Sequence, residues 1–326
     1  SRTARRLERR VGLVPGDTVL DIGANDGSLL RSYSTPDIVR VGIDPTIAKF
    51  REFYDDSCIP VADFFSARAF DSVSTARARI VTSIAMFYDL EDPVAFARDI
   101  RTVLADDGLW HFEQSYMPWM LRSGAYDTIC HEHLEYYSLT TIKRILDEAG
   151  FVIVDVATNA VNGGSISVTA AKDDGSWTTQ SILPAWLLEQ ERRNGVHEIQ
   201  TWEAFAETIR TLQTDLLELL RSLRASGQTI MGLGASTKGN VLLQTTGIGT
   251  DLVSAVGDVN PYKFGRFLPG TEIPILSEDE VLAARPDYLL ILPWHFRETF
   301  MVTLEPYLAD GGRLIFPLPD IEVVGY

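Results

Sequence analysis

Thirteen residues near the middle of the chain, 125–137, hold an unusual density of titratable side chains. They include two histidines, three carboxylates and three tyrosines, although the whole chain has only five histidines. Histidine titrates near neutral pH, and a flanking carboxylate can fix its tautomer and raise its basicity. The segment is therefore a candidate acid–base site, whose candidate catalytic residues are His131, Glu132, His133 and Tyr136.

Two other interpretations of this segment stay open. A polar junction between a loop and a helix has a similar composition, and Ser138 would then cap the following helix. The pair His131-x-His133 fits zinc ligands carried on a strand, but no third or fourth ligand follows at the spacing of a metal site. We therefore expect no metal. The chemistry of the segment depends on the elements around it.

Composition limits the function classes. The 326 residues suffice for two domains with sizeable cores, and a formal net charge of −16 disfavours binding to nucleic acid phosphates. No apolar run approaches the ~20 residues that span a membrane. Two cysteines, Cys58 and Cys130, give no disulfide framework, so a reducing, cytoplasmic setting is expected. Because the net charge is negative, an anionic substrate would need a local positive site. Separately, the composition of residues 3–10 predicts a basic helix.

A glycine turn follows the first predicted strand, at 18–22. Asp21, Gly23, Asn25 and Gly27 lie around the spacing Asp-x-Gly-x-x-x-Gly, just before a predicted helix. Glycine lets the backbone approach a ligand closely, and the first turn of a helix offers free N–H groups. The spacing differs from the Gly-x-Gly-x-x-Gly of dinucleotide-binding proteins and resembles motif I of the class I S-adenosylmethionine (SAM) methyltransferases. We therefore expect these four residues to bind the cofactor.

Three further strand ends carry side chains suited to a nucleoside. Asp44 follows the strand 39–43, where an acid can accept both hydroxyls of a ribose. Asp63 and Phe64 end the next strand, where an acid can meet the adenine amino group and an aromatic ring can cover the base. Ser83 lies in the fourth strand. One such position is common in turns and caps, but four in register favour a SAM site.

The carboxyl ends of the later strands predict a substrate side of the crevice, because ligands of open α/β sheets bind there. Tyr88 follows the fourth strand and Glu113 ends the fifth, and the His-Glu-His segment follows soon afterwards, where we expect it to cover the crevice. Asn162-Gly163-Gly164 joins two β-rich runs. A simple hairpin turn is one interpretation of these residues, and close backbone approach to the substrate is the other.

The second half of the chain repeats a strand, a glycine turn and a helix at 229–240. Glycines, a serine and a lysine at this turn suit a phosphate, because backbone N–H groups and the helix dipole attract it and the lysine adds a point charge. The order of a P-loop is absent. A small basic island follows the predicted strand 253–256. The candidate substrate-binding residues of this half are Ser236, Lys238, Gly239, Asn240, Asn260 and Lys263.

Strands alternate with helices along both halves, which predicts an α/β fold class with two Rossmann-like doubly wound sheets. We expect a class I SAM methyltransferase fold over 1–173, a helical connector over 174–226 and a second Rossmann-like domain over 227–326. Within the connector, apolar residues at steps of three and four between 202 and 223 predict an amphipathic helix closed by Gly227.

Taken together, these motifs resemble the SAM-dependent C-methyltransferases that act on nucleotide-linked 4-keto-deoxysugars. The resemblance runs along nearly the whole chain. Its first glycine turn is shared by methyltransferases at large, whereas the His-Glu-His segment and the second glycine turn are specific to the family. The matching residues are the 21–27 turn, 126–129 with 131–133, Asn162-Gly163-Gly164-Ser165, and Gly234-Ala235-Ser236 with Lys238-Gly239-Asn240.

The resemblance implies a function and roles for residues. SAM would bind the first fold, the second fold would help to hold a nucleotide-diphosphate keto-sugar, and His133 would be the base that removes a proton next to the ketone. His131 is the alternative base, and Glu132 or Tyr136 would orient the imidazole or stabilise the enolate oxygen. An O- or N-methyltransferase for another small anionic metabolite is the alternative function. A non-enzymatic nucleotide-binding module is a further one.

Three features depart from the family pattern. Family members usually begin with a small cysteine-rich zinc domain, so either this chain, which starts without methionine, is truncated or its branch lacks that domain. The residue before His-Glu-His is often tyrosine and here is Cys130. The segment 85–89 differs as well, which leaves methylation at C-3 or at C-5 open.

Overall fold

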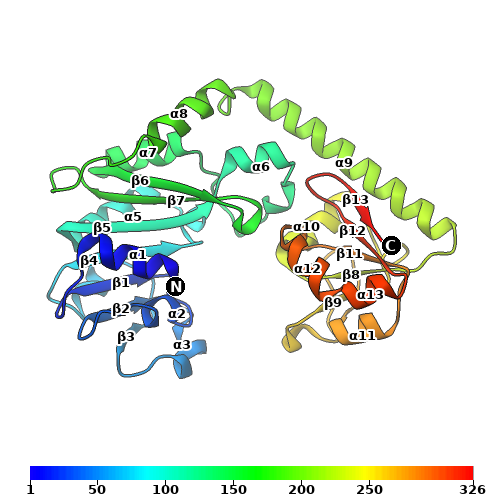
Figure 1. Cartoon of the computed structure of the whole chain (residues 1–326), viewed down its shortest axis with the longest axis horizontal. Helices are drawn as coiled ribbons and strands as arrows, with labels where there is room; N and C mark the ends of the chain where they lie inside the picture. Colours follow the sequence, from blue (N-terminus) through cyan, green and yellow to red (C-terminus); the bar gives the residue numbers. More distant parts are fainter. Residues whose placement is uncertain (326) are drawn as a thin grey trace. The chain divides into compact units, whose positions relative to one another are not determined.

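The computed structural model describes residues 1–325, except for the side chain of residue 162. The chain divides into two compact units (Figure 1). The first unit contains residues 1–117, 134–159 and 164–194, and the second contains 118–133, 160–163 and the chain from Gly195 onward. Each unit is an α/β fold with its own sheet, so the predicted fold class is confirmed.

The first unit is built on a seven-stranded sheet with the order β3-β2-β1-β4-β5-β7-β6. All neighbours from β3 to β5 pair in parallel, and β7 runs antiparallel to both β5 and β6. The central strand β1 is buried along its whole length, as expected for a parallel strand covered on both faces. The strands are β1 (Thr18–Ile22), β2 (Val39–Ile43), β3 (Cys58–Val61), β4 (Ala78–Ile84), β5 (Leu104–Ser115), β6 (Phe151–Asn159) and β7 (Ser165–Lys172).

Helices cover this sheet on two faces, each with its own apolar core. Phe70, Ile100 and Ile142 belong to one core, and Leu7 and Leu30 belong to the other. Because both faces are buried, the carboxyl ends of the strands are left for ligands. The helices of this unit are α1 (Arg2–Val11), α2 (Ser28–Arg31), α3 (Ile47–Phe50), α4 (Ala67–Asp71), α5 (Pro93–Val103), α7 (Leu139–Glu148) and α8 (Leu183–Arg193), with 3₁₀ turns η1 (Arg51–Phe53) and η2 (Phe87–Asp89).

The second unit has a six-stranded sheet with the order β10-β9-β8-β11-β12-β13. Its strands pair in parallel except for the last, which pairs antiparallel with β12. This closing strand was absent from the sequence-based expectation. The strands are β8 (Ile230–Leu233), β9 (Val256–Asp258), β10 (Ile275–Ser277), β11 (Tyr288–Ile291), β12 (Arg313–Phe316) and β13 (Glu322–Val324).

The long helix α9 (Ile199–Ala225) belongs to the second unit and contains the predicted amphipathic stretch. No helix of the described residues is both long and apolar enough to cross a membrane. The other elements here are α6 (Met117–Ser123), α10 (Thr237–Thr246), α11 (Glu278–Ala283), α12 (Arg297–Thr303) and α13 (Glu305–Ala309), with 3₁₀ turns η3 (Tyr126–Thr128), η4 (Val161–Gly163), η5 (Pro261–Lys263) and η6 (Trp294–Phe296).

One predicted strand is wrong in its bounds. The apolar run 253–256 was expected to be a strand, but β9 starts only at Val256. The N–H groups of Leu252 and Val253 donate to the carbonyl of Gly249, so the chain is still turning there. Leu252 and Val253 are nevertheless buried, so the apolar run correctly indicates burial although it does not form a strand along its whole length.

Candidate active site

The glycine turn between β1 and α2 borders a cavity of about 280 Å³ in the first unit. Gly23 and Gly27 have φ of 72° and 74°, in the left-handed region that favours glycine. A Cβ atom at Gly27 would lie 3.1 Å from the Tyr54 ring, so this turn also has no space for a side chain. Residues that line the cavity include Asp21, Gly23, Ala24, Asp26, Ile84 and Glu113. A glycine turn beside a cavity fits a bound nucleoside.

Asp44 ties the end of β2 to this turn. One carboxylate oxygen accepts the N–H of Asn25 at 3.0 Å, and the other accepts the N–H and the hydroxyl of Thr46, each at 2.6 Å. Asn25 itself has a φ of 47°. A carboxylate has about four acceptor sites, so three bonds leave Asp44 able to accept one more donor, such as a ribose hydroxyl.

Asp21 lies at the floor of the turn as a buried acid. It accepts a 2.6 Å hydrogen bond from the Thr82 hydroxyl. Burial away from water raises the pKa of Asp21 to about 7, and the nearby carboxylates of Asp44 and Asp26 raise it further against the effect of Thr82. Asp21 lines the cavity and is therefore placed to meet a ligand.

We expect Asp21 to make the free energy of unfolding fall as pH rises. In the folded chain it holds its proton up to about pH 7, whereas in the unfolded chain it ionises near pH 4. Stability should therefore decline between about pH 4 and pH 7 and level off above, by up to a few kcal/mol. Asp21→Asn should lack this decline in denaturant unfolding at pH 5 and pH 8. An equal decline in wild type and variant would show that other groups cause it.

The remaining predicted cofactor residues, Ser83, Asp63 and Phe64, are not among the residues that line this cavity. The Ser83 side chain is fully buried and accepts a 3.0 Å hydrogen bond from the Trp110 indole, so its hydroxyl belongs to the core. Asp63 and Phe64 follow β3 and are both exposed, with Phe64 exposed by 77%. The Asp63 carboxylate accepts the N–H of Phe64.

Several predicted substrate residues of the first unit anchor loops. Glu113 accepts a 3.0 Å hydrogen bond from the Asn159 amide at the end of β6. The carbonyl of Tyr88 accepts the N–H groups of residues 134 and 135, which fixes the chain just after the His-Glu-His segment. Tyr136 lies on this fixed stretch and is half-buried. The carbonyl of Gly164 accepts the N–H of Tyr116.

His133 lies in the second unit, where its ring is oriented from the backbone. Its Nδ1 lies 2.9 Å from the carbonyl oxygen of Thr128 in η3. A carbonyl can only accept, so Nδ1 carries the proton and Nε2 of the neutral ring carries the lone pair. Burial lowers the pKa of His133, and Lys238 lowers it further. His131 and Glu132 are exposed beside it. Of the two histidines, His133 alone has a ring whose tautomer is fixed by a described backbone bond.

The residue before Thr128 is a buried carboxylate. Asp127 is 1% exposed, and its Oδ2 accepts a 2.8 Å hydrogen bond from the Trp294 indole in η6. Its Oδ1 is buried without a hydrogen-bond partner in the described part of the chain. The Trp294 ring also packs against Gly163: a Cβ atom added at Gly163 would lie only 3.1 Å from the ring. The Gly163 position therefore needs glycine for space as well as for its φ of 85°.

Lys238 is the nearby positive charge of this carboxylate, and it also acts on His295. Burial raises the pKa of Asp127 and lowers that of Lys238, and each partly offsets the shift of the other by attraction. Burial and the Lys238 charge lower the pKa of His295 to about 4, so this ring is neutral at pH 7. Among the described residues, no three His, Cys, Asp or Glu side chains form a group that could hold a metal ion.

The second glycine turn is shaped mainly by helix capping and packing. The Ser236 hydroxyl accepts the N–H of Gly239 at 3.1 Å and so caps α10. A Cβ atom at Gly239 would lie 2.9 Å from Leu292 Cβ, which explains the glycine. The Asn240 Oδ1 is buried without a described partner. The side chain of Asn162, also predicted to bind substrate, lies outside the described part of the structure.

Lys263 is engaged within the protein. Its ammonium donates to the Asp258 carboxylate at the end of β9 and to the carbonyl of Ala235 in the glycine turn, both at 2.9 Å. The predicted basic island thus contains a cation already neutralised by Asp258. Asn260 is exposed, and its side chain accepts the N–H of Tyr262.

Sequence reasoning missed the roles of Asp127, Trp294 and His295. Asp127 was part of a recognised motif but had no role, because its contacts lie 167 residues away along the chain. The only available signal was position: Trp294 and His295 come three and four residues after the end of β11, and loops after the strands of α/β sheets carry functional side chains.

Comparison with known proteins agrees with this architecture. Residues 1–156 match the family of methyltransferase domains, and residues 160–319 match the family of C-methyltransferase C-terminal domains. Over 317 residues the chain is 32% identical to the C-methyltransferase NovU of Streptomyces niveus, an alignment that covers 97% of this chain and 75% of that protein.

Solved structures of low identity are also similar. A putative methyltransferase from Bacillus halodurans is 13% identical with a TM-score of 0.41, over 53% of this chain and 99% of that one. A putative methyltransferase from Haloferax volcanii, solved with the activator Trm112, is 16% identical with a TM-score of 0.41, over 53% of this chain and 94% of that one.

The sheet order and the glycine turn after its first strand define the first unit as a class I SAM methyltransferase fold. The chain belongs to the C-methyltransferase family, as its relative and both domain matches show. It is a SAM-dependent C-methyltransferase, and its cofactor is S-adenosyl-L-methionine.

Proposed function

We propose that this enzyme methylates a carbon next to the ketone of a nucleotide-linked 4-keto-deoxysugar, at C-3 or C-5. The observation that carries the proposal is the His133 ring, with Nδ1–H bonded to the Thr128 carbonyl and a lowered pKa. Methyl transfer to carbon needs a base, because a C–H bond is a poor nucleophile until its proton is removed. A neutral imidazole with Nε2 as its acceptor is such a base at pH 7.

The reaction then follows from the chemistry of the ketone. The carbonyl group acidifies the neighbouring C–H bonds, and His133 Nε2 takes one of these protons. Glu132 or Tyr136 stabilises the imidazolium or the enolate oxygen. SAM, when bound, would supply an electrophilic methyl group to the enolate carbon, with S-adenosylhomocysteine as the leaving group. Positioning of the two substrates contributes much of the rate.

We assign the two units different parts of the ligand set. The first unit holds SAM through the turn 21–27, with Asp44 meeting the ribose. The second unit takes part in holding the sugar nucleotide through Lys238 and the first turn of α10. Lys238 supports this assignment because this half-buried lysine lies at the start of a ten-residue helix, where an anion is favoured.

The proposal predicts a gain of one methyl group when the enzyme is incubated with SAM and a thymidine- or guanosine-linked 4-keto-6-deoxysugar. Mass spectrometry of the products measures it. In deuterated water without SAM, the same sugar should exchange a proton next to its ketone, and His133→Asn should abolish the exchange. Methylation without any such exchange would instead indicate transfer to oxygen or nitrogen.

A further inference from the structure

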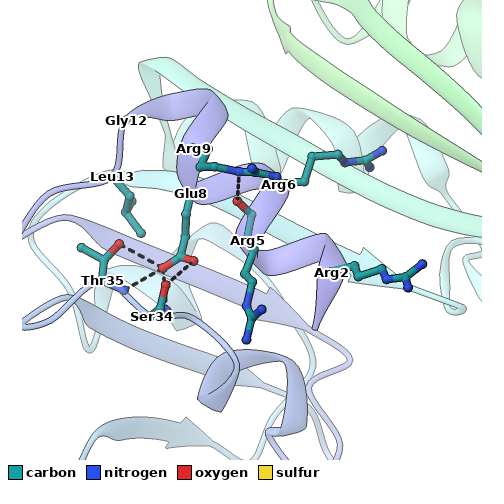
Figure 2. Close-up of a pocket in the computed structure, with 9 residues that line it drawn as sticks. All are labelled: Arg2, Arg5, Arg6, Glu8, Arg9, Gly12, Leu13, Ser34 and Thr35. Carbon is teal, nitrogen blue, oxygen red and sulfur yellow. Dashed lines mark hydrogen bonds between the residues drawn. The ribbon is translucent and has the colours of Figure 1, made fainter.

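Helix α1 concentrates positive charge in an acidic protein. Five of its ten residues are arginines, whereas the whole chain has a net charge of −16. The helix is strongly amphipathic, with Ala4, Leu7 and Val11 buried against the sheet. The opposite side borders a hollow of about 820 Å³ lined by Arg2, Arg5, Arg6 and Arg9 together with Ser34 and Thr35 (Figure 2).

The one acidic residue of the helix, Glu8, also lines the hollow, and its carboxylate is bound by the loop 34–35. Glu8 accepts the N–H groups and hydroxyls of Ser34 and Thr35, at 2.6 to 3.0 Å (Figure 2). These bonds keep the pKa of Glu8 below its usual value despite its burial. They fix the loop 34–35 against the helix, so the wall of the hollow is held in place, and Glu8 makes no ion pair with an arginine of α1.

Only one of the five arginines has a carboxylate partner among the described residues. Arg10 pairs with Asp155 at 3.0 Å. Arg6 lies 3.4 Å from the ring of His111, whose pKa falls to about 3 through burial and the nearby arginines, so that ring carries no charge to repel or attract. Arg2, Arg5 and Arg9 have no carboxylate within 4.0 Å in this part of the chain, and all three are exposed.

The first turn of α1 also borders the cofactor cavity. Ser1 and Thr3 line the cavity that contains the glycine turn and Glu113, and Arg2 and Arg5 line the neighbouring hollow. A ligand whose reactive carbon reaches the cofactor cavity could therefore place an anionic group beside these arginines, because both spaces belong to the first unit.

We propose that the arginine hollow of α1 binds the diphosphate of the nucleotide-linked substrate. This inference rests on the proposed function. Arginine suits phosphate because its planar guanidinium donates two parallel hydrogen bonds. Of the two lysines near the second glycine turn, Lys263 is already bound to Asp258 and Ala235, and the charge of Lys238 is partly offset by Asp127. The concave shape fits a small ligand, and the net charge of −16 opposes a nucleic acid.

Inorganic pyrophosphate tests the site without the sugar. We expect Arg2→Gln/Arg5→Gln to raise the Kd for pyrophosphate at least about tenfold in calorimetry at low salt, since charge-assisted hydrogen bonds are lost. The Kd for SAM should stay within about twofold of wild type. Arg144→Gln/Arg221→Gln removes the same charge from exposed arginines of α7 and α9, and it should leave both constants unchanged.

Kinetics then separate this site from the substrate class. With a 4-keto-sugar nucleotide that is methylated, the α1 variant should raise KM about tenfold or more with little change in kcat. Methylation with unchanged KM would overturn the arginine site and leave the proposed function standing. If pyrophosphate binding depends on Arg2 and Arg5 but no keto-sugar nucleotide is methylated, the arginine site is supported and the proposed substrate class is contradicted. An equal loss of pyrophosphate affinity in the control variant would show that only net charge matters and would overturn the proposal. Binding of a short RNA at least as tightly as pyrophosphate would overturn it as well.

Discussion

His133→Asn should lower turnover by about 10²–10⁴-fold, the usual contribution of a positioned general base. Asparagine keeps a polar side chain of moderate size but cannot take a proton. The Kd for SAM should remain close to that of wild type in calorimetry, because the cavity beside the glycine turn belongs to the first unit and His133 to the second. Single-turnover rates measured with saturating SAM would isolate the chemical step.

The neighbouring histidine provides the matched control. His131 is exposed, so His131→Asn should cost much less than His133→Asn. A larger loss from His131→Asn would transfer the role of base to that residue. The pH profile gives an independent readout: the base acts when neutral, so kcat/KM should rise with pH through the pKa of His133. Because burial lowers that pKa, the rise should lie below pH 6.5 and be absent in His133→Asn.

Asp127→Ala should destabilise the second unit by about 2–4 kcal/mol. The substitution leaves the buried Trp294 indole N–H without its acceptor and Lys238 without its nearby negative charge. Turnover should fall as well, because Asp127 precedes Thr128, whose carbonyl orients the ring of His133, the proposed base. Asp127→Asn should be milder in stability, since its amide oxygen can still accept from Trp294.

Denaturant unfolding combined with hydrogen exchange in the second unit would measure this effect. Asp215→Ala on the exposed side of α9 is the control and should change stability by no more than about 0.5 kcal/mol. A double-mutant cycle with Trp294→Phe should give a coupling energy of about 1–3 kcal/mol. Additive effects of Asp127→Ala and Trp294→Phe would mean that the 2.8 Å bond contributes nothing to the fold.

The sequence predicted what depends on local pattern. The apolar strand 18–22 followed by glycines identified β1 and its turn, because the glycines need positive φ and the strand is buried on both faces. It could not predict the partner of a side chain across the sheet. Ser83 has the right position for a cofactor residue, yet its hydroxyl accepts from Trp110, 27 residues further on.

In the second unit, the partners of charged side chains were equally impossible to predict from the sequence. Lys263 lies in a run that counts as basic, but its ammonium is bound by Asp258 and Ala235, which only the fold brings together. Asp127 illustrates the reverse case, since one aspartate in a polar segment gives no sign that it will be buried against a tryptophan 167 residues away. Local periodicity predicts elements, whereas pairing of distant polar atoms requires coordinates.

The two bonds of Lys263 set the second glycine turn apart from the first. Asp258 ends the strand next to β8, as Asp44 follows the strand next to β1, and each accepts the N–H two residues further on. In the first unit that acid also holds the glycine turn directly, through Asn25. In the second, a lysine ammonium fills the gap between acid and turn. The second sheet therefore shares with the first the placement of an acid beside a glycine turn, but here a lysine of the chain itself already binds that acid.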